Sequence, residues 1–364
     1  MDRIAEFWFR VQGNLFPNLR ECLGTLSEGH QRVAMVLEFV RIENHVEPYY
    51  LQKLGRKLKD RKTLARAFVA KACYNDQTTK SFIDRLHVDT KLRRLCGWNL
   101  LCDVPSESTF SRAFAEFAET ALVNQVHEVL VQTYLGDELA FHISRDSTAI
   151  EARETPLEKP AKEEKPKHKR GHPKKGEVRP KAAPTRTEKQ YTQTAEESIS
   201  ELPKFCDVGT KIDSKGSKRH WVGYKFHVDV IDKGIPIAAV TTSASVHDSQ
   251  VAIPLSKMTA KRIASLYDLM DSAYDTKLID RVSRELGHVP IIKPHAGRRH
   301  KKEELEPDRA ERYKRRTVSE RFNSRLKDSF GGRNIRVRGH SKVHTHLMFG
   351  LLVIFAEALI GLVT

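Results

Sequence analysis

Residues 159–189 set the first limit on how this chain can fold. They contain twelve Lys or Arg against four Glu, few apolar side chains, and prolines at positions 160, 166, 173, 180 and 184. Proline breaks helices, and so polar a segment cannot bury enough surface to offset the entropy lost on ordering. We therefore expect a mobile basic insertion that separates two folded parts of the chain.

The basic charge is not confined to that segment. The chain has 364 residues, a net charge of +16 and a pI of about 9.6, and half of the charge lies outside the insertion. Cations placed against phosphates release counterions, so this balance suits a nucleic acid partner. Ribosomal proteins, nucleases and membrane-surface proteins share the same balance. The insertion itself is either a solvated linker or an arm that follows a DNA backbone.

Residues 1–135 have the periodicity of helices. Apolar residues recur three and four positions apart, both in the run KTLARAFVAKACYN and in the longer run that begins at Pro105. Paired helices of this kind either form a helix-turn-helix that reads DNA or give plain structural support. The pattern leaves both interpretations open.

After residue 136 the pattern changes to the alternation that is typical of strands. The first expected strand begins at residue 137 and ends at Asp146. Two further alternating or apolar runs, 222–230 and 235–242, are joined by the turn Asp232-Lys233-Gly234. This combination predicts an antiparallel hairpin.

Another expected strand, 264–270, ends at a second acid, Asp271. A helix is expected from Thr276, and a short strand from 289 to 293. Before them, the sequence Ser245-Val246-His247-Asp248 resembles a capping box that opens a helix. The order of elements predicts a mixed α/β sheet with two aspartates at strand ends.

The run ERYKRRTVSERFNSRLKDSF predicts a helix with two different faces. Val318, Phe322 and Leu326 form an apolar stripe at helical spacing. At about 100° per residue, the other face carries a lone carboxylate among an aromatic and two cationic side chains, all within an arc of roughly 60°. Those four residues are Tyr313, Arg316, Glu320 and Lys327.

Two aspartates at strand ends and one glutamate on a helix can converge on divalent cations. Mg²⁺ prefers oxygen ligands, and a pair of such ions can activate a nucleophile and stabilise the leaving oxygen of a phosphodiester. Asp146, Asp271 and Glu320 are therefore the candidate catalytic and metal-binding residues. The alternative is that acids at the ends of elements only cap helices.

Four neighbouring residues compete for the same roles. Asp268 or Asp275 could replace Asp271 as the ligand, but the strand-end position favours Asp271, and Asp275 is expected to cap the next helix. His247 and Asp248 could form a metal pair, although helix capping is the simpler interpretation.

The residues now identified resemble the DDE transposases of bacterial insertion sequences. More narrowly, they look like the group with a Tyr-x2-Arg-x3-Glu-x6-Lys signature, which matches at every spacing from Tyr313 to Lys327. Asp271 lies in DSAYD, and Asp146 lies in ISRDSTAIEARE, both similar to the surroundings of the family's acids. The segments DVGTKIDSKG, WVGYKFHVDV, VHDSQ and VPSESTFSRAF add to the resemblance, which covers most of the chain.

The resemblance implies a ribonuclease-H-like α/β core with a mixed sheet, a helical N-terminal domain and a disordered basic insertion. The expected divisions are a helical DNA-end-binding or support domain at 1–135, the first core strand at 136–154, and the flexible insertion at 155–200. The rest of the catalytic core then occupies 201–342, and an apolar helix ends the chain at 343–364.

The implied function is that of a transposase that binds terminal inverted repeats, cleaves there and joins 3′ ends to target DNA. The implied cofactor is Mg²⁺, which Mn²⁺ can replace, held by Asp146, Asp271 and Glu320. Tyr313, Arg316 and Lys327 would contact the DNA. The partners would be double-stranded DNA and a second copy of the chain. A non-catalytic DNA-binding descendant and a structure-specific nuclease are the alternatives.

Three further cations are candidates for contacts with DNA. Lys225 lies in the hairpin and either reaches phosphate or is an ordinary strand lysine. Arg336 and Arg338 follow the two-faced helix and either bind backbone or belong to a solvated loop. His295 and His300 fit a basic DNA-facing loop better than a metal site. No glycine-rich phosphate loop is evident, so we expect no nucleotide cofactor.

The expected location is the bacterial cytoplasm, in association with the nucleoid. Five cysteines without a CxxC pair fit a reducing compartment, and the charged start MDRIAEFWFR does not resemble a signal peptide. Residues 347–364 are nearly long enough to span a bilayer, but Glu357 lies in their middle. We expect a buried terminal helix and no membrane partner.

Overall fold

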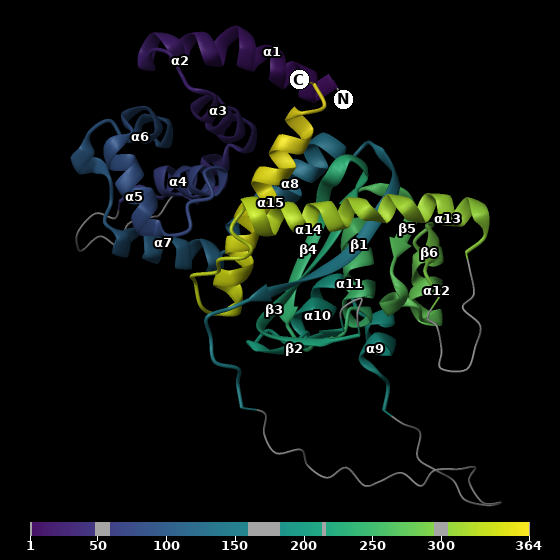
Figure 1. Cartoon of the computed structure of the whole chain (residues 1–364). Helices are drawn as coiled ribbons and strands as arrows, with labels where there is room; N and C mark the ends of the chain where they lie inside the picture. Colours follow the sequence, from purple (N-terminus) through teal and green to yellow (C-terminus); the bar gives the residue numbers. More distant parts are fainter. Residues whose placement is uncertain (1, 48–58, 159–182, 213–215, 295–304, 364) are drawn as a thin grey trace, which may run out of the picture.

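The computed structural model describes residues 2–47, 59–158, 183–212, 216–294 and 305–363 (Figure 1). Helices make up the first part, as the sequence predicts. The expected helical run after Pro105 is two helices, because Ala121 adopts a left-handed φ of 51° between them. The elements are α1 (Asp2–Arg10), the π-helical η1 (Val11–Leu15), α2 (Phe16–Leu23), α3 (Glu28–Val40), η2 (Ile42–His45), α4 (Arg61–Cys73), α5 (Thr79–Val88), α6 (Thr90–Cys96), η3 (Leu101–Asp103), α7 (Glu107–Glu119) and α8 (Leu122–Leu135).

The second part is built on a six-stranded mixed sheet. β1 lies inside the sheet, antiparallel to β3 on one side and parallel to β5 on the other, and β6 continues the parallel part. β3 also pairs in antiparallel fashion with β4, which is the expected hairpin, and with β2. The strands are β1 (Leu139–Glu151), β2 (Asp207–Ile212), β3 (Lys218–Ile231), β4 (Ile235–Ser243), β5 (Ala264–Met270) and β6 (Val289–Ile292).

Helices cover both faces of this sheet. Along β1, successive side chains point to opposite faces. Arg145 points toward α11, where it donates a hydrogen bond to Ser256, and Asp146 points toward α14, where Asn323 donates to it. The remaining elements are α9 (Arg186–Thr192), α10 (Ala195–Ser200), η4 (Asp232–Gly234), α11 (Ser249–Ala260), η5 (Ser272–Tyr274), α12 (Lys277–Glu285), α13 (Pro307–Tyr313), η6 (Lys314–Arg316), α14 (Thr317–Ser329) and α15 (His340–Ile360).

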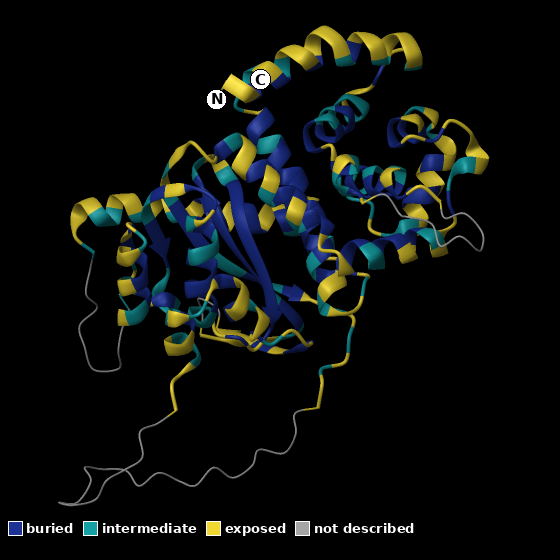
Figure 2. Cartoon of the chain, turned by 180° about the vertical axis from the view of Figure 1, so that it is seen from behind, coloured by how far each residue is buried: buried dark blue, intermediate teal, exposed yellow. Residues whose placement is uncertain are grey.

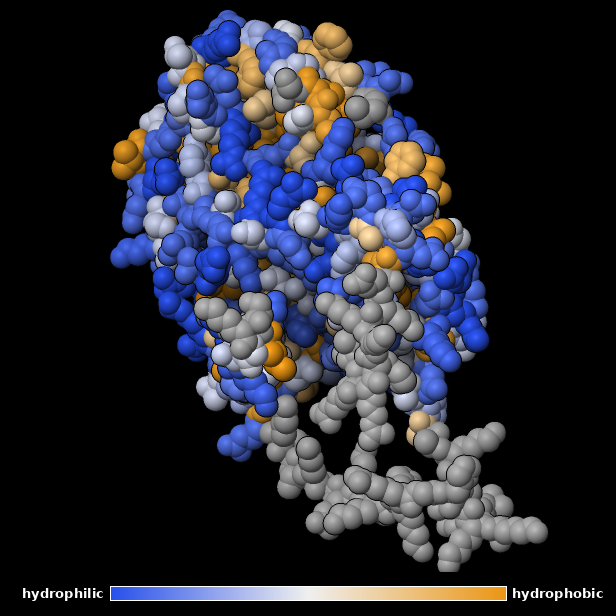
Figure 3. All heavy atoms as spheres, turned by 45° about the vertical axis from the view of Figure 1, so that its right-hand side comes forward, coloured by the Kyte–Doolittle hydropathy of each residue, from blue (hydrophilic) through white to orange (hydrophobic). Residues whose placement is uncertain are grey.

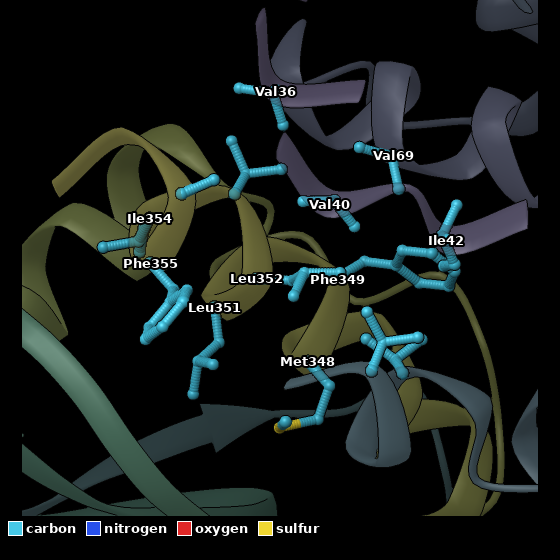
Figure 4. Close-up of a cluster of buried hydrophobic side chains, with 14 of the residues drawn as sticks. Val36, Val40, Ile42, Val69, Met348, Phe349, Leu351, Leu352, Ile354 and Phe355 are labelled. Atoms are coloured by element: carbon cyan, nitrogen blue, oxygen red, sulfur yellow. The ribbon is translucent and has the colours of Figure 1, made fainter. Parts of the chain in front are cut away.

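Helix α15 joins the two parts through one hydrophobic core. It packs on β4 and on α3, α4, α7 and α8. Figure 4 shows its apolar side chains meeting those of the N-terminal helices, among them Val36, Val40, Ile42 and Val69. The helix is long and apolar enough to cross a membrane, but 78% of its most apolar stretch is buried inside the protein. The predicted buried terminal helix is confirmed, although it begins at His340.

The chain regains structure earlier than the predicted insertion 155–200 implies. Residues 186–200 form α9 and α10, each opened by a capping box, Thr185 with Glu188 and Thr194 with Glu197. Both helices pack on α11, on the outside of the sheet. Strand β2 is also absent from the predicted elements. The rest of the basic segment, 159–182, lies outside the described residues.

Most of the surface is polar. In Figure 3 the visible face is covered mainly by hydrophilic residues, and apolar residues form small separate groups. Figure 2 shows that the buried residues concentrate in the sheet, in α15 and in the inward faces of the N-terminal helices. This surface suits a charged partner better than an extended apolar one.

Candidate active site

Asp146 lies in the middle of β1, and the prediction that the strand ends there is wrong. The antiparallel ladder with β3 continues to Glu151, because Thr148 and Ile150 pair with Phe226 and Tyr224. The carboxylate still faces α14 and is largely covered, with 17% of its side chain exposed. Asp146 therefore projects from a rigid, fully paired strand.

Asp271 comes directly after β5, as predicted. The parallel register sets Ser144 of β1 beside Leu269 of β5. Continued by two residues, that register places Asp271 next to Asp146, on strands that are about 4.8 Å apart. The Asp271 carboxylate also accepts a hydrogen bond of 2.9 Å from the backbone N–H of Ala273, which fixes its direction.

The third acid, Glu320, lies on α14 across from β1. Val318, Phe322 and Leu326 are buried, so the predicted apolar stripe is confirmed. The opposite side leaves 55% of the Glu320 side chain exposed. The segment is not one regular helix, since a 3₁₀ turn, η6, separates α13 from α14.

Arg316 connects two of the acids. Its Nη2 donates a hydrogen bond of 2.8 Å to Glu320 Oε1, and its Nη1 lies 3.4 Å from Asp146 Oδ1. The same guanidinium lies 6.0 Å from the centre of the Tyr313 ring. Three of the four signature residues thus gather around Asp146, and the guanidinium lies between two candidate metal ligands.

The fourth signature residue, Lys327, lies further along α14. Burial, together with the nearby cations Arg333 and Lys211, lowers the pKa of its amino group, and Glu151 opposes that shift. Like charges held this close favour an anionic ligand at this end of the helix.

The environment of Asp146 disfavours its charge. Burial raises the pKa of its carboxyl to about 6, Arg316 opposes that shift, and the neighbouring carboxylates Asp271 and Asp248 add to it. A buried carboxylate beside another carboxylate is a costly arrangement that a bound cation would relieve.

Three buried polar atoms near Asp146 lack a hydrogen-bond partner among the described residues. They are Arg316 Nη1, Asn323 Oδ1 and the hydroxyl of Tyr274. Asn323 uses its Nδ2 to donate a hydrogen bond of 3.1 Å to Asp146 Oδ2. The Tyr274 hydroxyl is close enough to Asp146, Asp271 and Asp248 for all three to raise its pKa. Arg316 Nη1 keeps its ion pair with Asp146, but buried groups without a hydrogen bond such as Asn323 Oδ1 and the Tyr274 hydroxyl are rare, and two of them near Asp146 are typical of a ligand site.

Sequence reasoning overlooked Asn323 and Tyr274. Asn323 follows Glu320 by three positions, so the helical repeat directs both to the same side of α14. Tyr274 is the tyrosine of DSAYD, three residues after Asp271. Both signals were present, but neither side chain is charged, so neither stood out as a candidate.

Lys225 is an internal residue of the sheet, and the expected contact with DNA is not supported by its surroundings. Its amino group donates to the backbone oxygen of Val246 and, at 2.9 Å, to Asp248. The capping box predicted at Ser245-Val246-His247-Asp248 is also wrong. Asp248 precedes α11, but its side chain makes no capping hydrogen bond and accepts one from Lys225. His227, buried beneath this pair, lies 3.9 Å from Asp248.

The two competing acids near Asp271 differ in their surroundings. Asp268 is buried on β5 and accepts hydrogen bonds from Ser283 and His288. Asp275 does not cap α12, because Thr276 is the capping residue. The register of β1 and β5 pairs Asp268 with Ile143, so its continuation brings Asp271 beside Asp146.

A buried ion pair lies on the opposite side of β1. Arg145 donates two hydrogen bonds, 2.8 and 2.6 Å long, to the Asp229 carboxylate of β3. Thr259 of α11 donates to the same carboxylate, and Ser256 accepts from Arg145. These contacts fix β1 against β3 and α11 directly behind Asp146.

The structure brings only some of the candidate residues together. Among the residues that it describes, no three His, Cys, Asp or Glu side chains are placed closely enough to hold a metal ion. Asp146 and Asp271 are neighbours, but Glu320 turns toward Arg316. Arg336 and Arg338 lie beyond the end of α14, at a separate cavity. His295 and His300 lie outside the described residues.

Comparison with known protein families gives two matches. A family model described as "Transposase DDE domain" matches residues 142–356, which include all three acids. A second, described as "Transposase domain (DUF772)", matches residues 26–116, within the helical part. No curated protein and no solved structure matches the chain.

Proposed function

The chain belongs to the transposases with a DDE domain, and from this premise we propose that it acts on the terminal inverted repeats of an insertion sequence. It binds these repeats, cleaves phosphodiester bonds at the element ends and joins the 3′ ends to target DNA. The observation that carries this proposal is the placement of Asp146, Asp271 and Glu320 on β1, after β5 and on α14.

A divalent metal fits this site by its donor chemistry. The candidate ligands are carboxylate oxygens, which suit Mg²⁺ and also Mn²⁺. The unpartnered Oδ1 of Asn323 and hydroxyl of Tyr274 offer further oxygen contacts to a bound ion or its waters. When bound, the metal activates the attacking oxygen and stabilises the leaving one. Glu320 joins the two aspartates by rotation of its exposed side chain.

The surrounding side chains orient the DNA. Arg316 can exchange its contacts with Asp146 and Glu320 for a phosphate, because guanidinium groups bind phosphate and carboxylate with the same geometry. Tyr313 flanks that position, and Lys327 neutralises the backbone further along α14. These assignments keep the scissile phosphate between β1 and the side of α14 that carries Glu320.

The arrangement of strands supports a ribonuclease-H-like core. β1 lies between an antiparallel hairpin and two parallel strands, and Asp146 on β1 and Asp271 directly after β5 lie at neighbouring positions. We assign the helical N-terminal region to recognition or support of the DNA ends. We also propose a homodimer that holds two ends together, acting in the bacterial cytoplasm on the nucleoid.

The proposal is tested by cleavage and strand transfer. DNA that carries the gene with its native flanks is incubated with purified protein and Mg²⁺, together with a plasmid target. The Glu320→Gln variant is compared with Glu311→Gln, the same substitution at an exposed glutamate of α13. Wild type and Glu311→Gln should cut at the flanking repeats and join the ends, whereas Glu320→Gln should bind without cutting.

Other outcomes identify the alternatives. Cutting without joining would indicate a structure-specific nuclease, and specific binding without cutting by the unaltered protein would indicate an inactive descendant. Cutting by Glu320→Gln at the rate of the wild type would show that the assignment of Glu320 is wrong.

A further inference from the structure

A cavity of about 490 Å³ lies between the N-terminal helices and the chain that follows α14. Residues of α4, α5 and α7 form one wall. Residues 330–349, from the end of α14 into α15, contribute the other. The cavity therefore joins the two regions that match separate transposase family models.

Four cations line this cavity. Arg336, Arg338 and Lys342 are exposed, and no hydrogen bond or ion pair joins them to any other residue that the structure describes. Lys71 is half-buried, donates to the backbone oxygen of Asp76, and has its pKa lowered to about 8 by burial. A nearby anion would favour its charged form.

The acids in the same walls do not neutralise these cations. The carboxylate of Asp76 is held by Arg85 at 2.9 Å, which leaves Glu107 as the other acid of the lining. The cavity consequently presents an excess of positive charge, with polar groups such as Thr78 in its lining. Five phenylalanines also line the cavity, and its four cations are the groups that phosphates would contact.

The cavity continues a path of cations that starts at the candidate active site. Helix α14 runs from Glu320 to its end beside Phe330, a distance of about 15 Å at 1.5 Å per residue. Lys327 lies on the way, with Lys211 and Arg333 close enough to lower its pKa. In B-DNA the phosphates of one strand are about 3.4 Å apart along the axis, so 15 Å corresponds to about four to five base pairs.

We propose that this cavity binds the sugar-phosphate backbone of the element end, about four to five base pairs from the cleaved bond, so that the N-terminal helices and the catalytic core hold one DNA end together. The proposal rests on the proposed function, since it takes the element end as the ligand. It assigns the N-terminal region a direct contact with DNA and gives the duplex a direction along α14, from Glu320 toward Lys327.

The test compares two triple variants of the full chain. The first is Arg336→Gln/Arg338→Gln/Lys342→Gln. The control is Arg20→Gln/Lys62→Gln/Arg94→Gln, which removes three exposed cations outside the cavity. Binding of a duplex that carries the element end is measured over a series of salt concentrations, and the complexes are mapped by hydroxyl-radical footprinting. Thermal unfolding of both variants checks that they fold.

The cavity variant should lose contacts at defined positions. Each phosphate contact contributes about 0.9 to the slope of log affinity against log salt, so the slope should fall in magnitude by about 2 to 3. Protection about four to five base pairs from the cleaved bond should disappear, while protection at the bond itself remains. The control variant should keep both.

Two results would overturn the proposal. If the cavity variant had the footprint and salt dependence of the control, the cavity would not bind the element end, and the proposed function would stand. If the unaltered protein neither bound nor cut its flanking DNA, both the proposed function and this inference would fail.

Discussion

The position of Asp146 predicts that its replacement by asparagine makes the protein more stable. Burial and the neighbouring carboxylates raise the pKa of Asp146 to about 6, against an ordinary value of 3.8, even though Arg316 opposes the shift. The carboxylate is therefore less favourable in the folded protein than in the unfolded chain. Asp146→Asn removes that charge and keeps the shape of the side chain.

The expected gain depends on pH in a defined direction. Below pH 3.8 the carboxyl is protonated in both states, so it contributes no difference. Between pH 3.8 and about 6 the unfolded chain loses its proton first, and the wild type loses stability as the pH rises. At 1.36 kcal/mol per pKa unit, the charge on Asp146 lowers the free energy of unfolding of the wild type by about 1.5 kcal/mol at pH 5 and by about 3 kcal/mol at pH 8.

Urea unfolding in the presence of EDTA measures this effect. The free energy of unfolding of Asp146→Asn minus that of the wild type should increase between pH 5 and pH 8 by about 1.5 kcal/mol. The hydrogen bond from Asn323 changes with the substitution, but its contribution does not follow this titration. A difference that is independent of pH, or a wild type more stable than the variant at pH 8, would refute the reasoning.

Three other substitutions test the packing around the site. Tyr274→Phe removes an unpartnered hydroxyl and should leave stability unchanged or raise it by about 1 kcal/mol in urea unfolding; a clear loss would reveal a structural partner. Asp229→Ala leaves Arg145 buried without its ion pair and should lower the free energy of unfolding by about 3–5 kcal/mol. A loss below about 1 kcal/mol in urea unfolding would contradict a structural role of this ion pair. In Gly350→Ala the new Cβ would lie 2.9 Å from the backbone oxygen of Phe330. Thermal unfolding should show that the free energy of unfolding falls by about 1–3 kcal/mol. Unchanged stability would mean that α15 moves away from the end of α14 easily.

Elements with strong local signals were predictable from the sequence. The hairpin of β3 and β4 follows from alternation on both sides of Asp232-Lys233-Gly234, and a helix was expected from Thr276, although Thr276 caps α12 in place of the expected Asp275. The apolar stripe of α14 was equally clear, because Val318 and its partners repeat at helical spacing. In each case the information lies within a few neighbouring residues.

Features that depend on residues far away in the sequence could not be predicted from local patterns. Strand β1 extends to Glu151 because β3 supplies a ladder there, not because the local pattern demands it. Lys225 has the pattern of an exposed strand lysine, yet Asp248, which follows it by 23 positions, takes up its amino group. Asn323 becomes a site residue only when α14 is placed across β1.

The most direct test of the account is whether Asp271 and Glu320 bind the same metal ions. Mn²⁺ is titrated by calorimetry into the wild type and into Asp271→Asn, Glu320→Gln and the control Glu311→Gln, without DNA. Mutation of residues that only support the metal ligands already lowers metal affinity by about 10- to 100-fold. Loss of a ligand in Asp271→Asn or Glu320→Gln should therefore weaken Mn²⁺ binding at least about tenfold. Glu311→Gln should bind Mn²⁺ like the wild type. Equal affinity in all four proteins would contradict a shared site of Asp271 and Glu320.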